Sequence, residues 1–254
     1  MLPVVLHHGL FGTGDLQLGP LKLSYFRGID RAIAARGHPL IVTRVHPCSS
    51  IENRARQMKE LVLRQLRVLG RDDEKVILIG HSLGGLDARY AVSKLGMASH
   101  VAAIVTVTTP HRGSPFADWV VRNLGRRLGG MQLVKFLRLD MRAVLDLTTT
   151  HCAKFNERIH DVPGIRYFSV SAARPWNRVP PFAMHAHRVV QAVDGDNDSL
   201  VSVKSSTWGE HLGVWPAHHW QTINRRYTFA MKDTTGDIVP YWMRMLDHVT
   251  SAIA

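Results

Sequence analysis

The sequence contains few cysteines and no long apolar run. Only Cys48 and Cys152 occur among its 254 residues, which excludes a disulfide-based scaffold, and we expect two buried thiols rather than a bridge. No apolar stretch approaches the ~20 residues of a membrane-spanning helix. The N-terminal residues lack the basic and apolar regions of a secretory signal peptide. We therefore expect a cytoplasmic protein that can contact membranes peripherally.

Acidic residues are scarce relative to basic ones. The chain has 20 Asp and Glu against 32 Lys and Arg, for a formal net charge of +12. Such a balance favours anionic partners such as nucleic acids or anionic membranes. The arginines are scattered, however, and neither zinc-finger spacing nor an aromatic RNA-binding motif is present. We predict no nucleic-acid partner; the sequence makes no prediction about oligomeric state.

Apolar segments of two kinds alternate along the chain. Short apolar stretches rich in β-branched residues predict strands at 4–8, 40–43, 76–79, 101–107 and 165–170. Longer stretches with helical spacing predict helices at 24–36, 49–70, 86–95 and 237–253, the second opened by a capping box at Ser49 and Glu52. Residues 200–203 fit either a short strand or a turn. This alternation predicts a single α/β domain over 1–254, with a mostly parallel sheet and helices on both faces.

A buried strand, a sharp turn and a helix are predicted in succession between residues 76 and 95. The turn carries Gly80-x-Ser82-x-Gly84. In this context the motif is typical of a nucleophile elbow, which strains the serine backbone and presents its hydroxyl above the sheet edge. The alternative is an ordinary glycine-rich turn. The flanking strand and helix favour the elbow, so Ser82 is the predicted nucleophile.

The segment from 116 to 147 interrupts the alternation of strands and helices. It contains two amphipathic stretches separated by Gly129-Gly130, each with arginines opposite its apolar face. Helices inserted after a core strand often form a lid over an active site. We predict a helical cap here, and two ordinary surface helices are the alternative.

A serine nucleophile needs a base and an orienting acid, which follow it in the chain order of an α/β-hydrolase. The loop at 194–198 offers Asp194, Asp196 and Asp198. Downstream, the pair His218 and His219 precedes the last predicted helix, and spacing alone does not separate the two.

An oxyanion hole requires two backbone N–H donors. The amide after the nucleophile, that of Leu83, is one candidate. Leu10 is the other, because it lies in the glycine-rich loop that follows the first strand.

Several segments together resemble the bacterial triacylglycerol lipases of the Pseudomonas and Burkholderia type, in the α/β-hydrolase superfamily. They are His8-Gly9-Leu10, Gly80-His81-Ser82-Leu83-Gly84-Gly85, Thr109-Pro110-His111-Arg112-Gly113-Ser114 with Ala117-Asp118, Phe155-Asn156, Asn197-Asp198-x-Leu200-Val201, and His219 with Asn224. The resemblance implies Ser82 as nucleophile, Asp198 as acid, His219 as base, Leu10 and Leu83 as oxyanion donors, and 116–147 as a lid.

The chain departs from that family at its calcium site. The resemblance implies a calcium-binding carboxylate two residues after the catalytic histidine, where this sequence has Gln221. It also implies a second aspartate well before the catalytic acid, but no acid occurs between 172 and 193. The loop at 194–198 also fails as an EF-hand, whose sixth and twelfth positions would be Ser199 and Ser205. We predict neither a metal nor another cofactor.

From these observations we predict a serine carboxylic-ester hydrolase that acts on acyl lipids through an acyl-enzyme intermediate. We also expect transient contact with a lipid surface. A phospholipase or an acyltransferase would use the same site. A non-catalytic module that binds membrane surfaces is the alternative from another class.

Overall fold

A computed structural model describes residues 1–12, 16–18, 21–126, 142–225 and 236–254. Its main sheet has six strands in the order β4-β1-β5-β6-β7-β8, and every neighbouring pair is parallel. The strands are β1 Val4–His7, β4 Leu40–Val42, β5 Val76–His81, β6 Val101–Val107, β7 Arg166–Ala172 and β8 Glu210–Trp215. A separate antiparallel pair joins β2 Leu16–Leu18 to β3 Leu21–Leu23. The sheet is open, and the predicted mostly parallel α/β sheet is confirmed.

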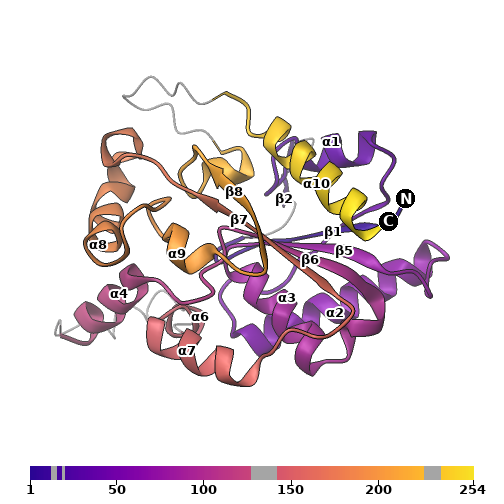
Figure 1. The fold of residues 1–254 in the computed structure, drawn as a ribbon, viewed down its shortest axis with the longest axis horizontal. Helices are drawn as coiled ribbons and strands as arrows, with labels where there is room; N and C mark the ends of the chain where they lie inside the picture. The colour runs from indigo at the N-terminus through magenta and orange to yellow at the C-terminus, as the bar shows by residue number, and fades with distance from the viewer. Residues whose placement is uncertain (13–15, 19–20, 127–141, 226–235) are drawn as a thin grey trace.

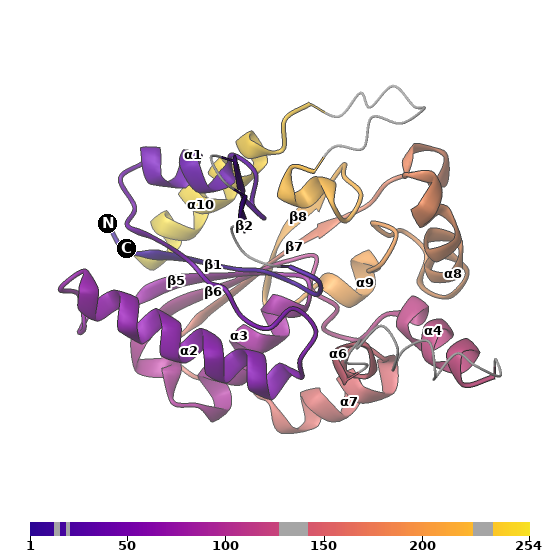
Figure 2. The same ribbon diagram turned by 180° about the vertical axis from the view of Figure 1, so that it is seen from behind.

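Helices cover both faces of this sheet. One face carries α1 Ile29–Ala35 and α10 Val239–Ile253, and the other carries α2 Ile51–Val68 and α3 Leu83–Lys94 (Figures 1 and 2). Alternate strand residues enter two separate apolar cores. Ile77 and Ile79 of β5 pack on the α1 and α10 side, whereas Val76 and Leu78 pack on the other side. Burial on both faces explains why the central strands are continuously apolar.

The remaining helices lie toward the carboxyl ends of the strands. They are α4 Pro115–Arg126, α6 Arg142–Asp146, α7 Thr149–Arg158, α8 Met184–Asp194 and α9 Val203–Ser206, with short 3₁₀ turns at Met97–His100, Trp176–Arg178, Pro181–Ala183 and Gln221–Ile223. Figure 2 shows α4, α6 and α7 grouped at one end of the molecule, with α8 nearby. No helix among the described residues is long and apolar enough to cross a bilayer.

Some predicted boundaries are wrong for local reasons. The N-cap of α2 is Ser50 rather than Ser49, because Ser50 has the extended backbone and its hydroxyl accepts from the Asn53 amide. The first helix begins at Ile29 and not at residue 24, since Gly28 before it is left-handed, with φ 76°. Residues 200–203 form a turn, closed by the Asn197–Ser202 bridge, that leads into α9.

The predicted cap is described only in part. Helix α4 covers most of its first amphipathic stretch, and α6 covers the end of its second. Residues 127–141, including Gly129-Gly130, lie outside the described residues. The start of α4 is held in place, because the Asp118 carboxylate accepts from the Thr149 amide at 2.9 Å and from its hydroxyl at 2.7 Å.

Candidate active site

Ser82 lies at the turn between β5 and α3. Its backbone has φ 55° and ψ −128°, a region that non-glycine residues rarely occupy. The surroundings hold this conformation: the Ser82 amide donates to the Val107 carbonyl at 2.9 Å, and the Ser82 carbonyl accepts from the Thr109 hydroxyl at 2.8 Å. The main chain is therefore fixed, and the side chain starts at the N-terminus of α3, where helix amides favour negative charge.

The glycines on either side of Ser82 are required by close backbone contacts. A Cβ on Gly80 would lie 2.6 Å from backbone atoms of Gly84 and Gly85. A Cβ on Gly84 would lie 2.7 Å from the His7 carbonyl oxygen. Any larger residue would push the elbow out of position.

Asp198 and His219 form a buried pair. His219 Nδ1 lies 2.6 Å from Asp198 Oδ2, and the His219 amide donates to the Asp198 carbonyl at 2.8 Å. The other carboxylate oxygen accepts from the amides of Leu200 and Val201, at 2.9 and 2.8 Å. These contacts fix the carboxylate and hold the imidazole with Nδ1 toward the acid, which leaves Nε2 for proton transfer.

The other candidates for the acid and the base lie elsewhere. Asp196 is exposed, and Asp194 accepts from the Ser202 hydroxyl at 3.0 Å. His218 faces its own turn, where its Nδ1 accepts from the Gln221 amide at 3.3 Å. Among the three aspartates and the two histidines, Asp198 and His219 form the acid–base contact described above.

The loop after β1 lies directly against the elbow. A Cβ on Gly9 would be 2.8 Å from Ser82 Cβ, so the loop backbone passes close to Ser82. The Leu10 side chain packs against the apolar cluster that contains Leu83. Over the described ranges of the chain, neither the Leu10 amide nor the Leu83 amide donates to a protein acceptor. Both N–H groups therefore remain available for a developing oxyanion.

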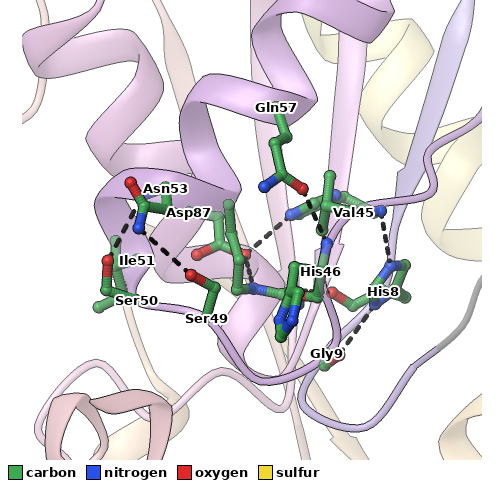
Figure 3. A network of polar contacts seen from close by, with 12 residues as sticks. His8, Gly9, Val45, His46, Ser49, Ser50, Ile51, Asn53, Gln57 and Asp87 are labelled. Carbon is green, nitrogen blue, oxygen red and sulfur yellow. Dashed lines mark hydrogen bonds and ion pairs between the residues drawn. The ribbon is translucent and has the colours of Figure 1, made fainter. Parts of the chain in front are cut away.

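A buried ion pair supports this loop from beneath. The Arg54 guanidinium donates to Asp87 Oδ2 at 2.8 Å, to the His8 carbonyl at 2.6 Å and to the His46 carbonyl at 2.8 Å. Figure 3 shows His8, His46 and Asp87 within this polar network. Burial raises the pKa of Asp87 to about 6 against the opposing effect of Arg54. The pair links α2, α3 and the loop that carries Leu10.

His8 is neutral at physiological pH. Burial, followed by the charge of His7, lowers the pKa of His8 to about 3. The neutral ring donates from Nδ1 to the Gly9 carbonyl at 2.9 Å and accepts at Nε2 from the Val45 amide at 3.2 Å. His8 therefore fixes the loop through hydrogen bonds and does not act as an acid.

Ser82 and His219 lie on neighbouring loops. The ring of His81, the residue before the nucleophile, is centred 4.8 Å from the His219 ring. In the described part of the protein no hydrogen bond joins Ser82 Oγ to the His219 ring. Catalytic hydrogen bonds are often long without substrate and tighten in the complex.

The Pro-His-x-Gly-Ser element, which begins at Pro110, makes structural contacts in the protein interior. His111 lies in the protein interior, with Nε2 3.0 Å from Thr106 Oγ1 and Nδ1 3.2 Å from the Arg89 guanidinium. Arg89 also donates to Asn156 at 2.9 Å and stacks 3.7 Å from the Trp208 ring. The element thus joins α3 to α7.

The sequence predicts no metal site. Gln221, where the lipase resemblance implies a calcium-binding carboxylate, is hydrogen bonded within the protein. Gln221 Oε1 accepts from the His218 amide at 3.2 Å. Within the described residues, no group of three His, Cys, Asp or Glu side chains could hold a metal ion.

Sequence reasoning missed several residues around the site. Arg54 lies on the same helical face as Ile51, Ala55 and Met58, and a charged residue among apolar ones was a usable signal of a buried ion pair. Tyr25 and Thr222, which contact His81, carried no signal in spacing or composition.

The fold and the elbow define an α/β-hydrolase, and comparisons with known proteins identify its family. The chain is 32% identical over 244 residues to triacylglycerol lipase 2 of Saccharomyces cerevisiae, covering 89% of this chain and 73% of that protein. It is 30% identical over 243 residues to the triacylglycerol lipase of Vibrio cholerae, covering 83% and 74%. The protein belongs to the triacylglycerol lipase family.

Further comparisons agree on the domain and the fold. The family model of the PGAP1-like alpha/beta domain matches residues 49–173. Mature Bacillus licheniformis lipase BlEst2 superposes with a TM-score of 0.74 at 21% identity, over 96% of this chain and 91% of that one. Staphylococcus hyicus lipase gives a TM-score of 0.70 at 16% identity, over 98% and 95%.

Proposed function

We propose that this protein hydrolyses carboxylic esters of acyl lipids through a Ser82–His219–Asp198 triad. The observation that carries the proposal is the buried Asp198–His219 pair, 2.6 Å between its nearest atoms, beside a serine in a strained elbow. Membership of the triacylglycerol lipase family supports an acyl-lipid ester as substrate. Acyl-lipid surfaces are then the expected partners.

The chemistry follows from the placement of each group. Ser82 Oγ attacks the ester carbonyl while His219 Nε2 takes its proton, and Asp198 stabilises the imidazolium. The amides of Leu10 and Leu83 donate to the oxyanion of the tetrahedral intermediate. Its collapse releases the alcohol, which takes the proton from His219, and leaves an acyl-enzyme. Water repeats the sequence and frees the fatty acid.

We also propose that the segment 116–147 caps the site. Phe116 and Trp119 of α4 stack with ring centroids 5.7 Å apart, and Trp119 meets His185 of α8 at 4.5 Å. An apolar helix face of this kind suits the cover of an acyl-chain site.

The direct test is hydrolysis of p-nitrophenyl esters from acetate to palmitate, combined with fluorophosphonate labelling of Ser82. Ser82→Ala should abolish labelling and lower turnover by several orders of magnitude. His219→Ala and Asp198→Ala should lower turnover by nearly as much. The matched control variants His218→Ala and Asp194→Ala should lower turnover only slightly.

Other outcomes would point to other functions. A wild-type protein that neither labels nor turns over esters, yet binds anionic liposomes, would contradict the proposal and favour a membrane-binding module. New ester formed from an added alcohol would indicate acyl transfer instead of hydrolysis. Severe loss in His218→Ala with an active His219→Ala would reverse the assignment of the base.

A further inference from the structure

The side chain of His81 is buried, and both of its ring nitrogens are hydrogen bonded. Nδ1 lies 2.9 Å from Tyr25 Oη, and Nε2 lies 2.9 Å from Thr222 Oγ1. Tyr25 stands just before α1, and Thr222 follows His219 in the chain. The residue before the nucleophile therefore contacts two segments that are remote from it in sequence.

One set of proton positions satisfies all of these contacts. The Thr222 hydroxyl lies 2.6 Å from the His219 carbonyl oxygen and donates its single proton there. It then accepts from His81 Nε2–H, so His81 Nδ1 accepts from the Tyr25 hydroxyl. Tyr25 Oη in turn accepts from the Gly9 amide at 3.2 Å.

Every member of this chain is uncharged at neutral pH. Burial, followed by the charge of His219, holds the pKa of His81 well below its ordinary value. Burial also raises the pKa of Tyr25 to about 12. The contacts are thus ordinary hydrogen bonds between neutral groups in a dry environment, where an unmade bond is costly.

The chain connects the three loops that the reaction requires. It begins at the Gly9 amide in the oxyanion loop, passes through the residue adjoining Ser82, and ends at the carbonyl of His219 itself. The Thr222 carbonyl extends it, accepting from Trp242 Nε1 of α10 at 2.7 Å. In the histidine loop, Gln221 stands where the lipase resemblance implies a carboxylate, and its side-chain oxygen accepts from the His218 amide at 3.2 Å.

We propose that His81 is a positioning residue that, through Tyr25 and Thr222, sets the oxyanion loop and the His219 backbone in register with Ser82. The proposal rests on the function proposed above. A shift of about 1 Å between reacting groups can lower a rate roughly 100-fold. A histidine that merely filled the core would affect stability, whereas a positioning residue affects turnover per folded site.

The test uses Thr222, because its hydroxyl can be removed with little change of shape. Thr222→Val should lower kcat for p-nitrophenyl butyrate by about 10- to 100-fold, with KM within about twofold. Thr222→Ser keeps the hydroxyl and should restore kcat to within about threefold of the original. Tyr25→Phe should also lower kcat, because it removes the link to Gly9. Thr250→Val is the matched control, since that hydroxyl donates to the Leu246 carbonyl at 2.8 Å, far from the site.

Active-site titration with a fluorophosphonate separates positioning from folding. Full titration of Thr222→Val with a low kcat per labelled site would support the proposal. A kcat per site equal to that of the original protein, or a Thr222→Ser variant as impaired as Thr222→Val, would overturn it. If the original protein fails to label at Ser82, the proposed function itself is wrong. Normal labelling of the original with an unimpaired Thr222→Val would reject the positioning role alone.

Discussion

At the scale of single residues, the local motif predicted Ser82, whereas spacing left three candidate acids and only the family resemblance favoured Asp198. The three aspartates at 194, 196 and 198 are equivalent in spacing. Asp198 differs because a tight turn, with Ser199 at φ 98°, directs the amides of Leu200 and Val201 at its carboxylate. This turn is local, but the spacing of the three aspartates does not show which carboxylate receives the amides; only the resemblance of Asn197-Asp198-x-Leu200-Val201 to the lipases pointed to Asp198.

Our first prediction concerns Gly80. Gly80→Ala should lower the free energy of unfolding by about 3 kcal/mol and remove most ester hydrolysis, because its Cβ would meet rigid backbone. That Cβ would lie 2.6 Å from Gly84 and Gly85. Urea unfolding and turnover measure the two effects. Gly236→Ala is the control: with no described atom within 4 Å of its Cβ, it should change stability by less than about 0.5 kcal/mol. Equal stability of the two variants would contradict the steric argument.

At the scale of elements, the sequence predicted five of the six strands of the main sheet and missed β8, at one edge. Strands β1, β5 and β6 are apolar on both faces and were recognised for that reason. Strand β8 was not predicted as a strand, because it lies at the sheet edge, is only partly buried and contains Gly213 with φ 107°. Helices α7 and α8 were also missed: with few buried residues each, they leave only a weak apolar pattern.

The second prediction concerns the proposed cap. Activity per enzyme should rise when tributyrin passes its solubility limit, because a lipid surface would stabilise an exposed apolar face of α4. Any opening should leave the first turn of α4 in place, since Asp118 anchors it to Thr149. A smooth saturation curve across the solubility limit would count against a lid and favour an open site.

A variant on α4 sharpens this test. Trp119→Ala should raise activity toward dissolved substrate several-fold, because it removes the 4.5 Å ring contact with His185 on α8. Arg122→Ala, an exposed position on the same helix, is the control and should leave that activity unchanged. If both variants match the original protein, the contact between α4 and α8 does not restrain the cap.

At the scale of the whole molecule, buried neutral histidines predict instability in acid. Burial is the main cause that lowers the pKa values of His7, His8, His81 and His111, so the unfolded chain binds protons there that the folded chain does not. Stability is then fully present above about pH 6.5 and falls as the pH drops below it. Each of these histidines lowers the free energy of unfolding by up to about 2 kcal/mol between pH 6.5 and pH 5.

Asp87 has the opposite effect on the pH dependence of stability. Its folded pKa of about 6 lies above the ordinary value, so its burial becomes less costly as the pH falls through 6. This gain of about 1 kcal/mol at pH 5 is smaller than the histidine loss. Urea unfolding at pH 7.5, 6 and 5 should therefore show a steep decline. A flat profile would mean that these histidines become protonated without unfolding.

The last prediction is that the enzyme does not depend on calcium. In the His219 loop, Thr222 donates to the His219 carbonyl and Gln221 accepts from the His218 amide. Gln221 stands where the lipase resemblance implies a carboxylate, and a neutral amide binds calcium more weakly than a carboxylate. Dialysis against EGTA should leave both the melting temperature and the esterase rate unchanged. A drop of several degrees, restored by calcium but not by magnesium, would reveal a site built from other ligands.

The hydrogen bond from Trp242 to the Thr222 carbonyl also has a consequence for synthesis. A chain leaves the ribosome from its N-terminus, so α10 emerges after the other described elements of the domain. Ser82, Asp198 and His219 can all be outside the ribosome while Trp242 is still inside it. We expect such a nascent chain to have an unfixed histidine loop and no activity, so that ester hydrolysis begins only when α10 has docked.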